Sequence, residues 1–558
     1  MSERIFIGVA WPYANNRLHL GHVAGAYLPP DIFARYHRTK RNEVLMVSGS
    51  DQHGTPVTIR AEAEGKSPAE VAAFFHQKFV DSWAALGITF DLYTNTGTAN
   101  HAAVVQDIFL RLLDKDYLYK DIVSQPYCTK CKRFLPDRYV EGVCPSCKLP
   151  GARGDQCDAC GKPMNPADLL NACCKLCGAP PEFRHTEHFF LRLSAFQQTL
   201  LEWVNQNVDH WRPNVQRFTR RYLEEGLRDR AITRDITWGI PVPLPGYEDK
   251  RIYVWFEAVI GYLSASKEWA QGSGDPEAWR KFWQEECRSY YFIGKDNIPF
   301  HTIIWPAMLM GYGGLNLPYD VPSNEFLTVE AQKLSKSKNI AIWLEDFLSR
   351  YQPDALRYVL SVNMPDTSDT DFSWREFVRR NNDELVATYG NLVNRVLSML
   401  QRHFEGKVPQ PGDLDERSAG IIDRTEETLR TMDELLYACR FKEAIKTAMA
   451  LAAEANRYLD EKSPWKAVKT DKNAAAAALY TALCVISGLR TAFYPFLPFS
   501  SEKLHRFLGY GGSVEADGWQ LRRPVPEAPL NPPEALFIKL DDSVVDEEMS
   551  RLGLLPTK

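Results

Sequence analysis

The stretch that decides the fold reads IFIGVAWPYANNRLHLGH, from Ile5 to His22. It opens with an apolar run that predicts a strand, and a polar loop follows. The next predicted element is a helix over about residues 19–38, on which His19 and His22 share one face because they lie three residues apart. On their own, the two histidines are compatible with a metal site, an anion site or simple packing at the start of a helix.

The same pattern then repeats along the chain. Residues 44–47 predict a second strand, residues 48–54 form a polar turn, and residues 55–65 predict a second helix. A strand, a crossover helix and a strand are typical of a parallel, doubly wound sheet. Ligands of such sheets bind outside the carboxyl ends of the strands, where both polar loops fall. Apolar segments at 251–256 and 290–294 predict two further strands.

The composition is that of a globular protein with several domains. The chain has 558 residues, of which 45% are hydrophobic and 25% charged. No apolar run approaches the length of about twenty residues that a membrane-spanning helix needs, and the N-terminus lacks the apolar segment of a signal peptide. We therefore expect a cytoplasmic protein. Because the net charge is −5, RNA binding would depend on local basic patches.

Nine of the 12 cysteines lie between Cys128 and Cys177, and eight of these nine form four CxxC pairs, with Cys173 left over. In a chain without an export signal, this clustering favours metal over disulfides, and redox dithiols are the weaker alternative. Eight thiolates suit one or two tetrahedral zinc sites of four cysteines each, with a structural role because no position is left for a substrate. We expect a nested arrangement in which the inner pairs share one ion and the outer pairs share the other, and Cys173 could replace Cys174. The expected ligands are Cys144, Cys147, Cys157 and Cys160 for the inner site, and Cys128, Cys131, Cys174 and Cys177 for the outer site.

A second motif lies far downstream, where residues 331–338 read AQKLSKSK. Three lysines within six residues make a cationic loop, which alone is weak evidence because lysine runs are usually solvated surface. Together with the sequence HLGH at residues 19–22, this loop resembles the paired HIGH and KMSKS signatures of class I aminoacyl-tRNA synthetases. The two elements also occur in the order that this class shows.

Within that class, further motifs resemble the methionyl-tRNA synthetase family. The matching stretches are AWPYAN at 10–15, SDQHGTP at 50–56, YVWFEAVIGY at 253–262 and FIGKD at 292–296, followed by His301. A zinc insert between two half-folds is also a family feature, and the resemblance extends to about residue 510. Two positions depart from the family pattern: Val259 stands where proline is frequent, and Asn297 replaces an apolar residue. Both departures leave the detailed shape of the pocket open.

The resemblance implies ligation of methionine to tRNA. Methionine and ATP would form methionyl-adenylate and pyrophosphate, and the methionyl group would then pass to the 3′-terminal adenosine of tRNA(Met), including the initiator tRNA. A helix N-terminus favours phosphate through its backbone N–H groups and its dipole. The residues expected to bind ATP or to act in catalysis are therefore His19, Gly21, His22, Lys333 and Lys336, with Lys336 the stronger lysine by family analogy. We expect Mg²⁺ to accompany ATP.

The amino acid needs a carboxylate for its ammonium group and an apolar, polarizable pocket for its thioether. Asp51, at the end of a predicted strand, is the candidate carboxylate. The other residues expected to bind methionine are Ala10, Trp11, Tyr13, Trp255, Ala258, Tyr262 and His301. Ordinary core packing is the alternative for Trp255 and Tyr262.

The resemblance places anticodon recognition in the helical part of the chain. Asn391 and Arg395 are four residues apart on a predicted helix and present one polar face, and Trp465 offers a stacking plane. Without the resemblance, an asparagine and an arginine on a helix would indicate only solvated surface.

The expected fold class is α/β: a Rossmann-like, doubly wound parallel sheet split by a zinc-binding insert, followed by an all-α helical bundle that binds the anticodon. We expect the two halves of the catalytic domain at 1–115 and 231–325, the insert at 116–230, the lysine loop and stem-contact region at 326–380, the bundle at 381–510, and a tail at 511–558 that packs back on the body as an extended segment. We expect a monomer. The competing hypotheses are another class I synthetase and a non-catalytic RNA-binding descendant of a synthetase.

Overall fold

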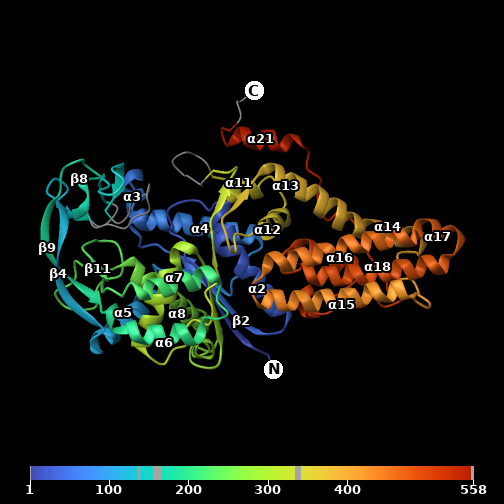
Figure 1. Cartoon of the computed structure of the whole chain (residues 1–558), viewed down its shortest axis with the longest axis horizontal. Helices are drawn as coiled ribbons and strands as arrows, with labels where there is room; N and C mark the ends of the chain where they lie inside the picture. Colours follow the sequence, from blue (N-terminus) through green and yellow to red (C-terminus); the bar gives the residue numbers. More distant parts are fainter. Residues whose placement is uncertain (1, 136–138, 155–156, 158–165, 333–340, 555–558) are drawn as a thin grey trace.

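The computed structural model describes residues 2–135, 139–154, 157, 166–332 and 341–554. A five-stranded parallel sheet with strand order β14-β13-β1-β2-β3 lies at its centre (Figure 1). The chain builds outward from β1 on one side and resumes at β13 on the other, which confirms the predicted doubly wound sheet and places its switch point between β1 and β13. The strands are β1 Arg4–Val9, β2 Glu43–Ser50, β3 Leu92–Asn95, β13 Arg288–Gly294 and β14 Ser323–Asn324.

Helices connect these strands as expected for parallel crossovers. The connection from β1 to β2 is one continuous helical run that consists of α1 Leu20–His22, the π-helix η1 Val23–Tyr27 and α2 Leu28–Thr39. The other helices of this part are α3 Thr55–Glu64, α4 Pro68–Leu86, α5 Ala99–Asp114, α9 Arg280–Trp283, the π-helix η6 Phe300–Ile304 and α10 Trp305–Tyr312.

The strand predicted at 251–256 is largely wrong. Only β12 Arg251–Ile252 is a strand, which pairs with β11 Thr233–Arg234, and helix α8 begins two residues later and spans Val254–Gly272. Most of α8 is buried, so its apolar residues do not follow one helical stripe. A short continuous apolar run cannot distinguish a buried helix from a buried strand by periodicity.

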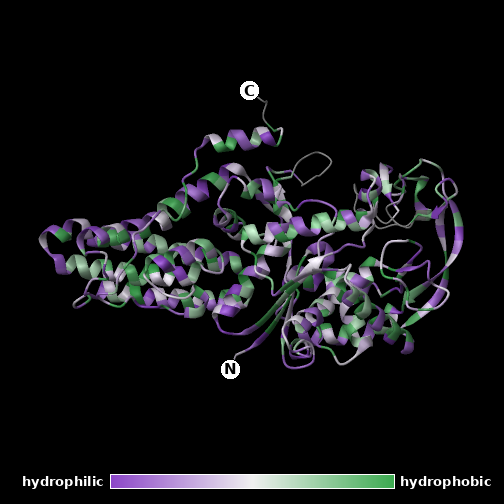
Figure 2. Ribbon diagram, turned by 180° about the vertical axis from the view of Figure 1, so that it is seen from behind, coloured by the Kyte–Doolittle hydropathy of each residue, from purple (hydrophilic) through white to green (hydrophobic). Residues whose placement is uncertain are grey.

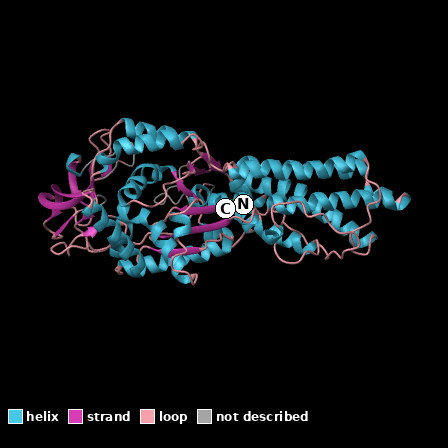
Figure 3. Ribbon diagram, turned by 90° about the horizontal axis from the view of Figure 1, so that it is seen from below, coloured by secondary structure: helices cyan, strands magenta, loops and turns pink. Residues whose placement is uncertain are grey.

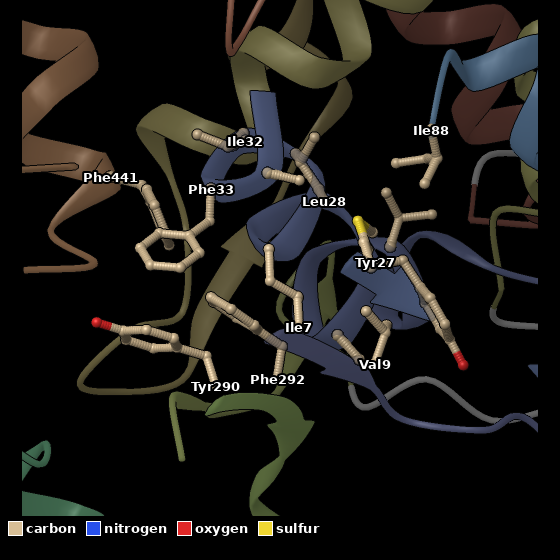
Figure 4. Close-up of a cluster of buried hydrophobic side chains, with 14 of the residues drawn as sticks. Ile7, Val9, Tyr27, Leu28, Ile32, Phe33, Ile88, Tyr290, Phe292 and Phe441 are labelled. Atoms are coloured by element: carbon tan, nitrogen blue, oxygen red, sulfur yellow. The ribbon is translucent and has the colours of Figure 1, made fainter. Parts of the chain in front are cut away.

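The core of the sheet is continuous with that of the helical bundle. β1 is buried from Ile5 to Val9, as is typical of a central parallel strand covered on both faces. Phe33 of α2 packs on Tyr290 and Phe292 of β13, with ring centroids 4.6 and 5.5 Å apart, and Phe441 from the bundle joins the same cluster at 6.4 Å from Phe33 (Figure 4).

The insert between the two halves of the sheet forms its own β structure. Strands β4 Leu118–Cys128 and β9 Glu182–Leu191 make a long antiparallel ribbon, which appears at one end of the molecule in Figure 3. The cysteines contribute to a small core that is separate from the main core. The remaining insert elements are β5 Arg133–Phe134, β6 Val140–Val143, β7 Pro150–Arg153, β8 Leu170–Cys174, β10 Arg230–Ala231, α6 Gln197–Asn207 and α7 Pro213–Glu224.

The C-terminal part is helical, as predicted. The helix that begins with α13 Trp374–Arg380 continues through the π-helix η7 Asn381–Gly390 into α14 Asn391–His403. The bundle helices show mixed polar and apolar residues along their length in Figure 2, as amphipathic bundle helices do. The other helices of this part are α15 Glu416–Tyr437, α16 Phe441–Lys462, α17 Pro464–Thr470, α18 Lys472–Phe493 and α19 Pro498–Phe507. Within the described part of the chain, α18 alone is long and apolar enough to cross a membrane by length and composition, and 89% of its most apolar window is buried in the fold.

Between β14 and the bundle lies a region of short elements, and after the bundle comes a tail. Strand β15 Leu327–Val329 pairs in parallel with β16 Thr370–Phe372, and between them lie α11 Leu344–Leu348 and α12 Pro353–Val362. The tail returns to the body, where α20 Val514–Asp517 contacts α2. It is not wholly extended, because it also forms helix α21 Ser543–Arg551 against α13 (Figure 1).

Candidate active site

His19 and His22 lie at the start of the helical run that follows β1. His19 caps α1 with an extended backbone, and its backbone N–H donates to Nδ1 of His22 at 3.1 Å. The two imidazole rings are 3.7 Å apart between centroids. Among the described residues, neither histidine belongs to a cluster of three or more metal-ligating side chains. Two imidazoles at a helix N-terminus therefore favour an anion site over a metal site.

The segment that follows the lysine loop pairs with these histidines. Trp343 forms an antiparallel bridge with His19, the Leu20 N–H donates to the Ile342 carbonyl at 3.1 Å, and the Leu344 N–H donates to the Leu18 carbonyl at 2.9 Å. Although 324 positions separate Trp343 from His19 in the sequence, the fold holds the segment that follows the lysine loop beside the histidine helix. Lys333 and Lys336 themselves lie outside the described residues.

The residues before the lysine loop are fastened to β16 and α13. Glu330 and Ala331 adopt left-handed backbone conformations with φ of 50° and 58°. The Ala331 N–H donates to Asp371 at 2.8 Å, and the Trp374 N–H donates to Glu330 at 2.8 Å. The residues before the segment 333–340 are thus anchored on β16 and α13, and the residues after it are anchored on the histidine helix.

Trp11 lies between a strand and a helix of the sheet layer. A Cβ atom on Gly261 of α8 would come within 2.7 Å of the Trp11 ring, and one on Gly49 of β2 would also collide with that ring. Two glycines therefore provide the space that the indole occupies at the carboxyl edge of the sheet.

Asp51 is joined to the loop after β1 by backbone hydrogen bonds. Its N–H donates to the Pro12 carbonyl and its carbonyl accepts from the Ala14 N–H, both at 2.8 Å, so Tyr13 and Asp51 are held side by side. The rings of Tyr13 and Trp255 are 6.2 Å apart in an edge-on arrangement. The structure thus brings Tyr13, Asp51 and Trp255 together from three separate segments.

One face of α8 extends the same surface. Trp255, Ala258 and Tyr262 follow one another at helical spacings of three and four residues and so share that face. The Trp255 ring stacks on Phe300, with centroids 4.2 Å apart and planes 13° apart. Ala10, at the end of β1, is buried, and its carbonyl accepts a hydrogen bond from the Tyr27 hydroxyl at 2.9 Å.

Tyr262 and His301 form a buried polar pair. His301 Nδ1 lies 2.9 Å from the carbonyl of Asn297, and because that oxygen only accepts, Nδ1 carries the proton. His301 Nε2 then accepts from the Tyr262 hydroxyl at 2.8 Å. Burial lowers the pKa of His301 to about 4, so the imidazole is neutral near pH 7. The surface is therefore aromatic and uncharged here, which suits a thioether.

Asp51 differs from the ionised aspartate that we expected. Burial and the nearby charge of Glu257 raise the pKa of Asp51 to about 8, against the opposing charge and backbone N–H of His53. The side chain is therefore mostly protonated at pH 7 when no ammonium group faces it. His53, His101 and Glu257 were not predicted as site residues, and a single carboxylate within the apolar run 252–263 was the signal that could have found Glu257.

The cysteines form two clusters with the predicted nesting. Cys128, Cys131, Cys174 and Cys177 make one, and Cys144, Cys147 and Cys157 make the other, with the sulfurs of each cluster within 4.8 Å of one another. The Sγ–Sγ distances are 3.5 Å for Cys128–Cys177, 3.9 Å for Cys131–Cys174 and 3.6 Å for Cys147–Cys157. Four sulfurs around one zinc at ~2.3 Å would be ~3.8 Å apart, so these distances fit the ion.

The first cluster contains Cys174 and not Cys173, which decides the alternative that the spacing left open. Backbone N–H groups also point at the sulfurs: the Cys131 N–H donates to Cys128 Sγ at 3.3 Å, and the Cys147 N–H donates to Cys144 Sγ at 3.5 Å. Such bonds stabilise the thiolate form that a metal requires. Cys160, the fourth predicted ligand of the second cluster, lies outside the described residues.

Arg395 and Trp465 meet at the end of the bundle farthest from the sheet. The Arg395 guanidinium lies 4.8 Å above the Trp465 ring, and it also pairs with Asp460 at 3.2 Å. Asn391 is exposed one turn earlier on α14. Figure 1 shows helices α14 and α17 in the bundle. Together they carry a cation, an amide and a ring, which are groups that can bind unpaired bases by stacking and hydrogen bonds.

Comparison with known proteins gives one consistent family. Residues 5–397 match the family model of class I tRNA synthetases (M), and residues 408–554 match that of the anticodon binding domain of methionyl tRNA ligase. A methionine–tRNA ligase of Dehalococcoides mccartyi is 68% identical over 554 residues, which cover 99% of this chain and 100% of the relative. One of Thermomicrobium roseum is 51% identical over 99% of both chains. The structure of Mycobacterium tuberculosis methionyl-tRNA synthetase in complex with methionyl-adenylate is similar at a TM-score of 0.80 and 27% identity, over 96% of this chain and 100% of that one.

Proposed function

This chain belongs to the methionyl-tRNA synthetase family of class I aminoacyl-tRNA synthetases, and from that premise we propose which of its residues carry the reaction. Its activity is methionine–tRNA ligation. In activation, the carboxylate of methionine attacks the α-phosphorus of ATP and pyrophosphate leaves. The protein then has to position two anions and stabilise the charge of the transition state, because little covalent work is required of it.

ATP binds, in this proposal, at the start of α1. His19, Gly21 and His22 face the phosphates together with the backbone N–H groups of the helix N-terminus, and Lys333 and Lys336 close over the pyrophosphate. The single observation that supports this best is the pairing of Trp343 with His19, because it places the segment that follows the lysine loop beside the histidines. We expect Mg²⁺ to bind with ATP.

Methionine binds at the adjoining surface at the carboxyl edge of β1 and β2. Asp51 takes the ammonium group in a charge-assisted hydrogen bond, which also favours the ionised form of a carboxyl group whose pKa is otherwise raised. The thioether lies among the aromatic and apolar groups that surround Asp51. The proposed pocket residues are Ala10, Trp11, Tyr13, Trp255, Ala258, Tyr262 and His301.

Recognition of tRNA is assigned to the bundle. Asn391, Arg395 and Trp465 contact the anticodon bases, and the methionyl group passes to the 3′-terminal adenosine at the sheet. Action as a cytoplasmic monomer and charging of the initiator tRNA stay predictions, as do the domain boundaries 1–115, 116–230, 231–325, 326–380, 381–510 and 511–558.

Zinc is the proposed occupant of both cysteine clusters. In the first, Cys128, Cys131, Cys174 and Cys177 supply four thiolates with tetrahedral spacing, and in the second Cys144, Cys147 and Cys157 supply three, with Cys160 as the fourth. With all positions filled by protein, the ions would stabilise the fold of the insert and take no part in the chemistry.

ATP–pyrophosphate exchange tests the proposal directly. We expect exchange with methionine alone among the amino acids, and we expect Lys336→Ala to abolish it while thermal unfolding stays unchanged. Lys338→Ala, in the same segment but outside the KMSKS-like positions, serves as the matched control and should retain most of the exchange. Exchange driven by leucine or cysteine instead would favour another class I synthetase, and no exchange with any amino acid would favour a binding-only descendant. Full exchange by Lys336→Ala would remove that lysine from the mechanism.

A further inference from the structure

Glu257 is a buried carboxylate that the proposed mechanism does not use. Its side chain is fully buried on α8, within a helix whose neighbouring positions are apolar. A buried carboxylate is costly unless a cation and hydrogen bonds compensate it. In the described part of the chain its ion-pair contacts are to two histidines, His53 and His101.

His53 links Glu257 to Asp51. Its Nδ1 lies 3.0 and 3.1 Å from the two carboxylate oxygens of Glu257, and its backbone N–H donates to Asp51 Oδ1 at 3.1 Å. Trp238 supports this arrangement, because its Nε1–H donates to the Gln52 carbonyl at 2.7 Å and its ring lies edge-on to that of His53 at 5.4 Å. One histidine thus contacts both carboxylates from a fixed position.

Positive and negative charges do not balance around His53, Glu257 and Asp51. Burial alone would lower the pKa of His53, but the charge and hydrogen bond of Glu257 raise it above its ordinary value, which favours the imidazolium form beside Glu257. His101 of α5, whose Nε2 is 3.9 Å from Glu257, is neutral because burial lowers its pKa to about 3. Among the described residues, His53 is therefore the one group that can carry a positive charge between two carboxyl groups, Glu257 and Asp51.

We propose that Glu257 and His53 are positioning residues that prepare Asp51 for a cationic amino group, so that methionine binding is coupled to loss of the Asp51 proton. The His53–Glu257 ion pair leaves no spare positive charge for Asp51, which stays protonated until the ammonium arrives. The ammonium then pairs with the carboxylate, and the Asp51 proton passes to solvent. This inference rests on the proposed role of Asp51, and it adds that binding discriminates against an amino acid whose amine is uncharged.

The pH dependence follows from the groups that face Asp51, which are His53 on its own loop, Glu257 on α8 and, behind Glu257, His101 on α5. Because the pKa of Asp51 is raised to about 8, its carboxylate form is a minority species at pH 7 and becomes dominant above pH 8. We expect the KM for methionine to fall as the pH rises toward 8, and methionine binding at pH 7 to release protons. Calorimetry in two buffers of different ionisation enthalpy measures that release.

The most informative variants remove the charge of His53 or of Glu257 and keep Asp51. His53→Gln leaves Glu257 without its cation, which disfavours the Asp51 anion further. We expect the pH midpoint of KM for methionine to rise by about one unit, with KM at pH 7 up about tenfold and KM for ATP unchanged, since one pKa unit corresponds to a factor of ten. In the double variant His53→Gln, Glu257→Gln both charges disappear together, so KM for methionine should return to within about threefold of the parent.

Glu268→Gln is the matched control, because Glu268 lies three turns along the same helix and bonds Thr94 instead. Its pH profile should equal that of the parent. If His53→Gln does not fold, Glu257→Gln still tests the coupling, because it removes a charge that raises the pKa of Asp51 and should therefore release fewer protons on methionine binding, whereas the double variant should release about as many as the parent. An unchanged midpoint and unchanged proton release in both single variants, or equal increases in KM for methionine and for ATP, would leave Glu257 and His53 with a merely structural role. Asp51→Asn tests separately whether Asp51 binds the ammonium group, apart from the positioning role of Glu257 and His53. Methionine binding that this variant leaves unaffected would refute the proposed role of Asp51 itself.

Discussion

At the scale of single residues, the site depends on close packing that only glycine permits. Trp11 occupies space between β2 and α8 that a side chain at Gly49 or Gly261 would fill. Protein interiors are packed so closely that one additional methyl group moves its neighbours. The indole can take this position, and form part of the proposed methionine pocket, because Gly49 and Gly261 have no side chains.

Gly261→Ala tests this packing. The new Cβ would lie 2.7 Å from the Trp11 ring, so the indole must shift, and we expect KM for methionine to rise at least tenfold while KM for ATP changes little. A tenfold change corresponds to about 1.4 kcal/mol, which is within the cost of overpacking a core. Exchange kinetics with each substrate varied in turn provide the measurement.

Gly272→Ala, at the last residue of the same helix, has nothing within 4 Å of its new Cβ and is the matched control. It should leave both KM values unchanged. A folded Gly261→Ala variant with the parent KM for methionine would show that Trp11 does not bind the amino acid.

At the scale of elements, the strand and helix predictions succeeded where the apolar pattern was unambiguous. β1, β2 and β13 were predicted because short apolar runs ended in polar loops. The run at 251–256 was assigned to a strand, yet it belongs mostly to α8, because a helix buried on most sides has no polar stripe to reveal its period. The insert shows the reverse case, because the chemistry of its cysteines predicted the nested clusters without any knowledge of its strands.

Cysteine substitutions in the insert test the zinc proposal at this scale. We expect Cys128→Ser to lose one zinc per chain by metal analysis, since its sulfur belongs to the first cluster. Cys173→Ser is the matched control, because Cys173 lies next to Cys174 in the sequence but outside that cluster, and it should keep the parent zinc content. Limited proteolysis should show a less stable ribbon β4–β9 in Cys128→Ser only, because structural zinc contributes folding energy. Folded parent protein without zinc would contradict both sites.

At the scale of the whole molecule, a buried ionic network joins the sheet to the bundle. Arg357 of α12 is fully buried; it donates to Asp31 of α2 at 2.7 Å and to the carbonyls of Pro495 and Phe496 at 2.9 and 2.7 Å. Arg35 pairs with the same aspartate at 2.9 Å. The helical run that begins at His19 is thereby tied to the turn after α18, so the proposed ATP site and the bundle share one rigid connection.

Arg357→Met tests this connection. Removing one partner of a buried charge network leaves the others uncompensated, and we expect a loss of about 3 kcal/mol in unfolding free energy, seen as a lower thermal midpoint. Arg379→Met, which breaks an exposed ion pair with Glu376, should change stability by no more than about 1 kcal/mol. An Arg357→Met variant as stable as the parent would show that the network does not hold the two parts together.

The same network predicts an acid dependence. Burial would raise the pKa of Asp31, but Arg35 and Arg357 lower it from 3.8 to about 2. A carboxyl group with a depressed folded-state pKa stabilises the fold above its unfolded value and loses that contribution as the pH falls through the folded value. The difference in stability between the parent and Arg357→Met should therefore be full above pH 4 and shrink toward pH 2.

Local chemistry in the sequence was enough to predict several features: the strand–loop–helix at 5–22, the cysteine pairs, the lysine loop and the helical C-terminal part. Each depends on residues close together in the chain, whose spacing or polarity already implies a structure or a ligand. The family resemblance added the roles of Asp51, Trp255 and the anticodon residues. It was sufficient to predict the activity before any distance was known.

Only the tertiary structure decided how distant segments meet. It set Trp343 beside His19, chose Cys174 over Cys173, and placed His53 between Asp51 and Glu257. The physical reason is that a contact, a pKa or a charge balance depends on burial and on partners from other elements, which have no fixed separation along the chain. A glutamate within an apolar run is only an anomaly in the sequence, and the histidine from another loop makes it part of the site.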